Sequence, residues 1–176
     1  LKGVKESVRV YRVLAERDMP RCIRRMNGPA AALVGRRREL EMLQASVEAL
    51  RLGQSGAVWV KGDAGVGKSR LVYELSRLIP PETAWISSPC LEYARHVPYF
   101  PVLGLINRLS GSRAECGGRR ESGPEQYRQQ LYEDLRGAIE DSPLPVIICV
   151  EDAQWADESS MDILKNLLKP GHTPAH

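Results

Sequence analysis

The sequence predicts an α/β domain in which helices cover a parallel sheet, and three observations support that prediction. Residues 62–69 match the pattern G-x-x-x-x-G-K-[ST] in full. An apolar run at 57–60 precedes this loop and a helical pattern follows it, which is the strand, loop and helix context that the motif needs. A second apolar, β-branched run at 146–150 ends in two carboxylates, as a buried strand of a parallel sheet would.

The glycine-rich loop carries the chemistry of phosphate binding. Glycines let the backbone wrap an anion with its N–H groups pointing inward. The Lys68 ammonium would reach the β- and γ-phosphates of a nucleotide, and the Ser69 hydroxyl would bind Mg²⁺. A plain strand–turn–helix with chance glycines is the competing interpretation, and the four fixed positions with their flanks disfavour it. The loop residues are Gly62, Asp63, Ala64, Gly65, Val66, Gly67, Lys68 and Ser69.

The two carboxylates, Glu151 and Asp152, stand at the carboxyl end of the second strand, where open α/β sheets bind ligands. One acid can hold the water shell of Mg²⁺ and the other can orient a water for attack on the γ-phosphate. A solvated strand end is the alternative, and the presence of the phosphate loop favours the functional interpretation.

Size and composition narrow the function classes. The chain has 176 residues, enough for one domain with a core, and a net charge of +3, too small to indicate a nucleic-acid partner. We expect no membrane span and no signal peptide. Four scattered cysteines and three histidines do not form a metal site, and a reducing cytoplasm is the expected compartment. The first residue is Leu, so we expect a piece of a longer reading frame.

Along the chain, helices are expected at 37–52, from the phosphate loop to 79, from Pro101 onward, behind a capping box of Ser122 and Glu125, and after an Asp157 cap. Leu78 is expected on the inner face of the second of these, and Leu168 on that of the last. Strands are expected at 57–61, 84–88 and 146–150. Residues 1–14 end in a strand-like alternation, 15–32 are linker-like, 110–123 form a flexible loop, and the tail 170–176 shows no strand.

Several stretches resemble the AAA/STAND-type ATPase modules of bacterial multidomain regulators. They are 33–40, the phosphate loop with residues 69–71, 90–93, 98–101 and 150–157. The resemblance is strongest to the module that follows a class III adenylate/guanylate cyclase domain. It implies a P-loop NTPase fold of the ASCE/AAA kind, a three-layer sandwich with a parallel sheet, truncated after the acid-tipped strand and its following helix. Residues 1–14 would then close a cyclase domain, 15–32 form a linker, 33–169 the ATPase module and 170–176 a disordered tail.

The resemblance also implies residue roles. Val34, Gly35 and Arg36 would lie near adenine, and Arg70 would join the phosphate loop in binding ATP. Glu151 occupies the place of the Mg²⁺-associated acid and Asp152 that of the catalytic acid, with Lys68 on the phosphates and Ser69 on the metal. The usual order begins with Asp, so which acid plays which part stays open. Trp155 is expected to pack under the loop.

In the family's sheet a further strand separates the acid-tipped strand from the strand before the phosphate loop. No residues at 170–176 can supply it. We therefore expect this segment to bind ATP weakly, to turn over little and to be marginally stable. The predicted role is an ATP-binding regulatory module whose partners are ATP and flanking cyclase, sensor or output domains, with neither membrane nor nucleic acid bound. A small-molecule phosphotransferase and a non-catalytic truncated remnant are the alternatives.

Overall fold

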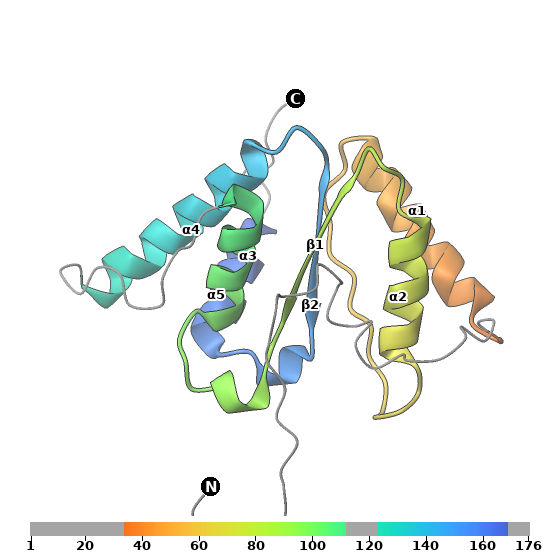
Figure 1. The fold of residues 1–176 in the computed structure, drawn as a ribbon, viewed down its shortest axis with the longest axis horizontal. Helices are drawn as coiled ribbons and strands as arrows, with labels where there is room; N and C mark the ends of the chain where they lie inside the picture. Colours follow the sequence, from red (N-terminus) through yellow and green to blue (C-terminus); the bar gives the residue numbers. More distant parts are fainter. Residues whose placement is uncertain (1–33, 112–122, 169–176) are drawn as a thin grey trace, which may run out of the picture.

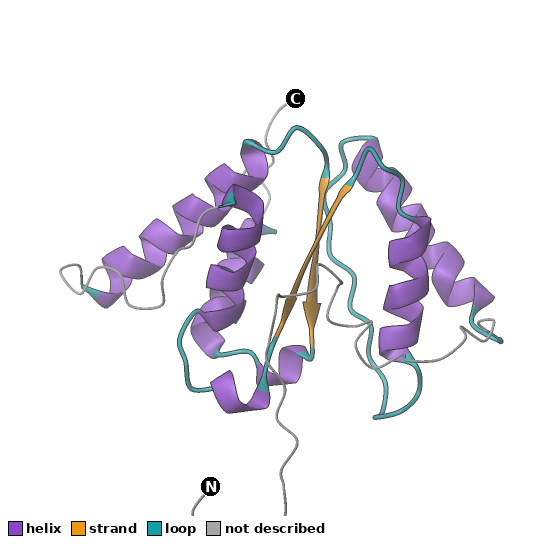
Figure 2. Cartoon of the chain, viewed as in Figure 1, coloured by secondary structure: helices purple, strands orange, loops and turns teal. Residues whose placement is uncertain are grey.

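A computed structural model describes residues 34–111 and 123–168 (Figure 1). The predictions for 1–14, 15–32 and 170–176, and for most of the 110–123 loop, lie outside these residues. In the described part, a two-stranded sheet lies between two groups of helices (Figure 2). Helices α1 and α2 cover one face, and α3, α4 and α5 cover the other. This arrangement agrees with the predicted α/β class and its three layers.

The sheet consists of β1 (Ala84–Pro89) and β2 (Val146–Glu151), which pair in parallel. The register sets Ala84 opposite Val146 and Pro89 opposite Glu151. Backbone bonds extend the pairing past both ends, from the Ala84 N–H to the Pro145 carbonyl and from the Cys90 N–H to the Glu151 carbonyl, each 2.8 Å long. The expected strands at 84–88 and 146–150 are therefore present. β2 is only half-buried along its length, although its apolar run predicted burial on both faces.

The strand expected at 57–61 is not formed. Residues 54–63 carry no strand assignment, and Val58 and Trp59 are 54% and 58% exposed. An extended segment becomes a strand only when its backbone N–H and C=O groups find a ladder partner. β1 and β2 pair with each other, and within residues 34–111 and 123–168 no other strand reaches 57–61.

The larger core lies where α3 (Phe100–Ser110), α4 (Pro124–Glu140) and α5 (Glu158–Leu167) meet the sheet. Ile86 of β1 and Ile148 of β2 pack against it. Leu168, expected to face inward, is exposed because it lies just past the end of α5. The buried members of this core are Val102, Leu103, Leu105, Ile106, Leu131, Leu135 and Ile163.

A smaller core joins α1 (Arg37–Arg51) and α2 (Lys68–Leu78) to the other face of the sheet. Leu43, Leu71 and Leu75 are buried there, and Trp85 of β1 packs against them. Leu78 was expected on this face but is 50% exposed at the last turn of α2. Ile79 packs against the core one residue later.

The starts of α4 and α5 can be compared with the caps that the sequence predicted. The N-cap of α4 is Gly123, which makes no side-chain capping bond, and Ser122 of the predicted capping box lies outside the described residues. Pro124 opens this helix instead, as proline favours the first helical position. Asp157 caps α5 as predicted, and its side chain accepts the Ser160 N–H.

None of the helices in the described ranges is long and apolar enough to cross a membrane.

Candidate phosphate-binding site

The phosphate loop connects the extended segment at 57–61 to α2. Gly65 and Gly67 adopt left-handed backbone conformations with φ of +83° and +90°, which only glycine adopts at little cost. A Cβ on Gly62 would lie 2.9 Å from Cγ2 of Val66, too close for any other residue without a shift. The glycines of the motif are thus required by this turn.

Lys68 closes the loop on itself. Its Nζ donates to the carbonyl oxygens of Gly62 and Asp63, each at 2.8 Å. These carbonyls stand in for the anionic oxygens that an ammonium at this position would bind. A phosphate entering the loop would therefore have to exchange with two backbone acceptors, and the Lys68 charge is already held in the loop.

The first turn of α2 presents N–H groups to the same region. Its N-cap is Gly67, which provides no side-chain cap, and the first intrahelical bond runs from the Leu71 N–H to the Gly67 carbonyl at 3.0 Å. The backbone N–H groups of Lys68, Ser69 and Arg70 thus precede the first intrahelical donor. Such a helix start, at the positive end of the helix dipole, favours an anion.

The Arg70 side chain points elsewhere. It forms an ion pair with Glu74, and its guanidinium lies 5.6 Å from the centroid of the Tyr73 ring. Both partners are on α2. Arg70 can therefore offer a nucleotide its backbone N–H, while its charge is engaged along the helix.

The segment before α1 reaches the loop through one side chain. Val34 is 85% exposed and Gly35 has a φ of +78°, so the chain turns sharply before the helix begins. The Arg36 guanidinium donates to the Val66 carbonyl at 2.8 Å. Of the three residues expected near adenine, Arg36 is thus placed on the phosphate loop.

The two acids lie at the end of β2 in different settings. Glu151 is the last residue of the strand and is half-buried, with its backbone held by Cys90. Asp152 is exposed and takes a left-handed conformation with a φ of +54°, and its carbonyl accepts the Trp155 N–H at 2.9 Å. This turn starts the short 3₁₀ helix η3 (Ala153–Trp155).

A contact that the sequence did not reveal fixes the same end of the sheet. The Asp157 Oδ1 accepts both the Ser160 N–H at 2.9 Å and the Tyr99 N–H at 3.2 Å, and the Ser160 hydroxyl donates to Oδ2 at 2.6 Å. Tyr99 is left-handed, with a φ of +63°, and is the N-cap of α3. Asp157 therefore joins the starts of α3 and α5. The spacing of 58 residues gives no sequence signal for this pairing.

Cys90 lies among these acids. Burial raises the pKa of its thiol to about 11, and the charges of Asp157 and Asp152 act in the same direction. Its thiol therefore stays protonated near neutral pH and is a poor nucleophile. It belongs to the buried framework behind the acids.

The loop and the acids lie at the same end of the molecule, at the carboxyl ends of β1 and β2 (Figure 1). The donor set fits Mg²⁺, since an exposed Ser69 hydroxyl and carboxylate oxygens are hard oxygen ligands. Within the described ranges, no group of three or more His, Cys, Asp or Glu residues could hold a metal by itself. A metal here would thus need ligands from the nucleotide or water.

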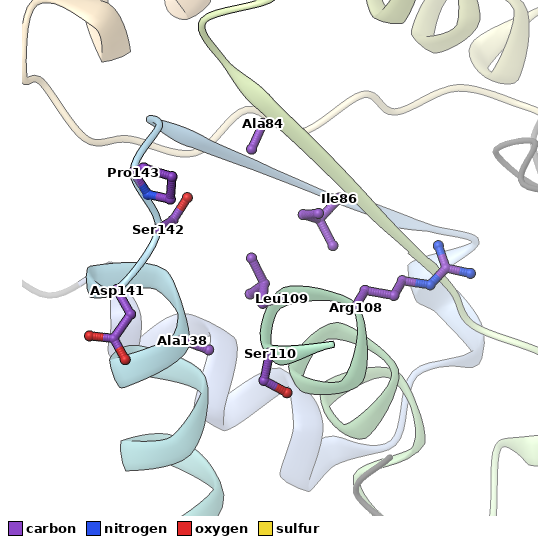
Figure 3. Close-up of a pocket in the computed structure, with 9 residues that line it drawn as sticks. All are labelled: Ala84, Ile86, Arg108, Leu109, Ser110, Ala138, Asp141, Ser142 and Pro143. Carbon is purple, nitrogen blue, oxygen red and sulfur yellow. The ribbon is translucent and has the colours of Figure 1, made fainter. Parts of the chain in front are cut away.

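A separate hollow of about 420 Å³ opens at the opposite end of the sheet (Figure 3). It is lined by residues from the start of β1, the end of α3 and the end of α4. Its one cation, Arg108, donates to the Ser87 carbonyl. This hollow contains none of the predicted phosphate-binding residues.

Comparisons with known proteins agree with the loop geometry. The family described as AAA ATPase domain matches residues 32–175. A curated relative, an uncharacterized protein of Rhizobium meliloti (strain 1021), is 26% identical over 205 residues, which cover 93% of this chain and 20% of the relative. The chain thus spans about a fifth of the length of that relative. No solved structure matches significantly. The chain belongs to the AAA ATPase domain family.

Proposed function

We propose that this chain binds ATP with Mg²⁺ through residues 62–69 and serves as a nucleotide-dependent regulatory module. The observation that carries the proposal is the phosphate loop itself. It combines left-handed glycines, a lysine ammonium held inside the turn and an uncapped helix start. Membership of the AAA ATPase domain family supports the same ligand.

The proposed residue roles follow the chemistry of phosphoryl transfer. Lys68 neutralises the β- and γ-phosphates, the Ser69 hydroxyl takes a position on Mg²⁺, and Val34 and Gly35 lie toward the base. Glu151 and Asp152 share the tasks of holding the metal's water shell and orienting the attacking water. Bound Mg²⁺ would supply charge stabilisation at the transferring phosphoryl group.

Hydrolysis places a stricter demand on the site than binding does. The segment at 57–61 and β2 share no ladder in the described residues, so their separation is not fixed by backbone hydrogen bonds. A misplacement of about 1 Å can cost roughly a hundredfold in rate. We therefore propose that this segment binds ATP and hydrolyses it slowly, and that full turnover belongs to a longer protein.

The proposed setting is a bacterial signalling or transcriptional regulator in the cytoplasm, linked to an adenylate cyclase domain. The cyclase link rests on the resemblance of residues 1–14 and of the module that follows them. The length of the Rhizobium relative, about five times the matched region, supports a multidomain parent. Nucleotide state would act there by changing how flanking domains are held.

Calorimetric titration with ATP and Mg²⁺ tests the proposal on the chain itself. Lys68→Ala is expected to abolish measurable binding. Lys61→Ala is the matched control, since it removes the same charge from an exposed residue just before the loop. Far-UV circular dichroism checks that both variants fold, because Lys68 also bonds the Gly62 and Asp63 carbonyls. Equal binding by wild type and Lys68→Ala would refute a phosphate-loop site.

A further inference from the structure

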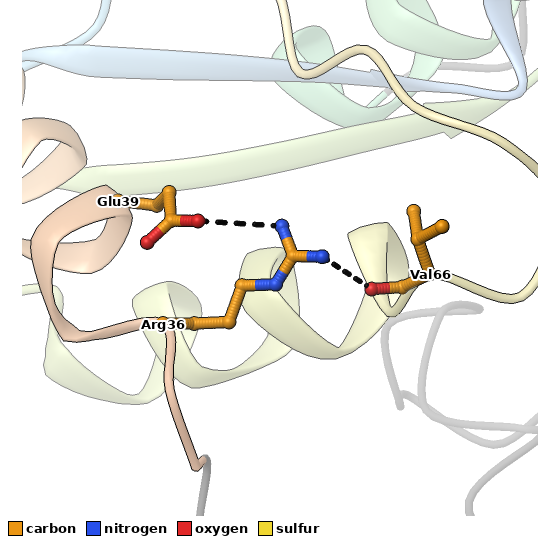
Figure 4. A network of polar contacts seen from close by, with 3 residues as sticks. All are labelled: Arg36, Glu39 and Val66. Atoms are coloured by element: carbon orange, nitrogen blue, oxygen red, sulfur yellow. Dashed lines mark hydrogen bonds and ion pairs between the residues drawn. The ribbon is translucent and has the colours of Figure 1, made fainter.

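Arg36 joins the start of α1 to the phosphate loop. It is the N-cap residue of α1, and its side chain reaches a residue 30 positions along the chain (Figure 4). Nη2 donates to the Val66 carbonyl at 2.8 Å, and Nη1 lies 3.5 Å from Glu39 Oε1 in the first turn of the helix. Glu39 therefore helps to orient the Arg36 guanidinium, which bonds to the loop through its other terminal nitrogen.

The bonded carbonyl belongs to a peptide unit whose N–H is that of Gly67. The structure has no cis peptide bond in its described residues, and in a trans peptide the C=O and N–H point in opposite directions. Holding the Val66 carbonyl toward α1 therefore turns the Gly67 N–H away from α1. This unit lies between Val66 and Gly67, and Gly67 has a φ of +90°, so on its glycine side no side chain fixes its orientation and the bond from Arg36 helps to hold it.

The cations that bond to the loop carbonyls also connect Arg36 with phosphate binding. Lys68 holds the carbonyls of Gly62 and Asp63 on one stretch of the loop, and Arg36 holds that of Val66 on the next. Two cations thus take three carbonyl oxygens of the loop. When a phosphate takes the Lys68 ammonium, Arg36 still holds the Val66 carbonyl, so the Gly67 N–H stays available to the anion.

We propose that Arg36 is a positioning residue for the phosphates, which acts through the Val66 carbonyl and not through the adenine base. The inference rests on the proposed function, since it concerns the same loop. It changes the role that the family resemblance implied for Arg36. Its consequence is that loss of Arg36 weakens every polyphosphate equally, whether or not a base is attached.

The test compares MgATP with magnesium tripolyphosphate, by direct calorimetry and by competition against ATP. Arg36→Ala is expected to raise both Kd values about tenfold, equivalent to about 1.4 kcal/mol. Arg36→Lys should fall between wild type and Arg36→Ala, because one ammonium cannot reproduce the planar fork that spans Val66 and Glu39. Arg37→Ala is the matched control: it removes an arginine paired with Glu41 on the solvent side of α1 and should change neither Kd more than about twofold.

Glu39→Gln keeps Arg36 and removes only its orienting carboxylate, so it provides a milder variant if Arg36→Ala fails to fold. It should weaken both ligands in the same proportion. A loss confined to ATP, with tripolyphosphate unaffected, would show a base contact and overturn the inference. Unchanged binding of both ligands would overturn it as well. Absence of ATP binding by wild type is a distinct result, which would overturn the proposed function and this inference with it.

Discussion

Replacing Asp157 with alanine tests how the acid-bearing end of the sheet is held. The carboxylate accepts three hydrogen bonds, from the Tyr99 N–H, the Ser160 N–H and the Ser160 hydroxyl. Two of these secure the first turn of α5, and the third holds Tyr99 in a left-handed conformation at the start of α3. One substitution therefore loosens two helices that meet in the larger core.

The magnitude follows from the separate losses. Removing an N-cap acceptor costs about 0.5–2 kcal/mol. The Ser160 residue is 0% exposed, so its hydroxyl would lose a partner without gaining water, at about 1–3 kcal/mol. We expect Asp157→Ala to lower the free energy of unfolding by about 3 kcal/mol in total, since the two effects share one side chain and do not add fully.

Urea unfolding followed by circular dichroism measures this change. Asp157→Asn keeps an acceptor for the backbone N–H groups and should cost about a third as much. Glu158→Ala is the matched control, because it removes an exposed negative charge from the same helix end and should cost under about 1 kcal/mol. If Asp157→Ala is no worse than Glu158→Ala, the bonds to Tyr99 and Ser160 do not stabilise the fold and the reasoning fails.

Three further predictions address the core, a thiol and the unpaired segment. Leu105→Ala empties a fully buried position and should cost about 2–5 kcal/mol in urea unfolding, against under about 0.5 kcal/mol for the exposed Leu168→Ala. The Cys90 thiol has a pKa of about 11 in the fold against an ordinary 9.0, so the unfolded chain loses its proton first and stability falls as pH rises between these values. Cys90→Ser should flatten that fall in urea midpoints measured across the range. Amide hydrogen exchange should be fast at 57–61 and slow in α3, and equal protection of the two segments would contradict the observed exposure. In the same experiment, MgATP should slow exchange in residues 62–69.

Local chemistry made several features predictable from the sequence. The glycine spacing and the lysine of the phosphate loop specify a backbone turn within eight residues, and the structure shows that turn. The apolar stripes predicted the helices that became α1 and α2, with Leu43, Leu71 and Leu75 buried. Asp157 could be predicted as a helix cap because a capping bond, here to Ser160, spans only three residues of the chain. Each of these depends on neighbours in the chain.

Features that depend on distant partners were not predictable in the same way. The run at 57–61 has strand composition, yet its exposure follows from the lack of a paired neighbour within the described part of the chain. The bonds from Arg36 to Val66 and from Tyr99 to Asp157 join positions 30 and 58 residues apart. The residues that neighbour each of these positions in the sequence do not indicate which distant residue it contacts. Positive φ at Tyr99 and Asp152 is equally hidden, because neither residue is glycine.

The two halves of the candidate site rest on different cores. The phosphate loop leads into α2, which packs with α1 in the smaller core, whereas β2 and the helices around its acids belong to the larger one. β1 is the element common to both, since Trp85 packs into the smaller core and Ile86 into the larger. Neighbouring strand residues point to opposite faces, so this division follows from the pleat. On the proposed function, nucleotide binding needs the half that holds Lys68, whereas hydrolysis needs both halves at a fixed separation across β1. We therefore expect variants of the acid half to reduce turnover with little change in affinity, and variants of the loop half to reduce both.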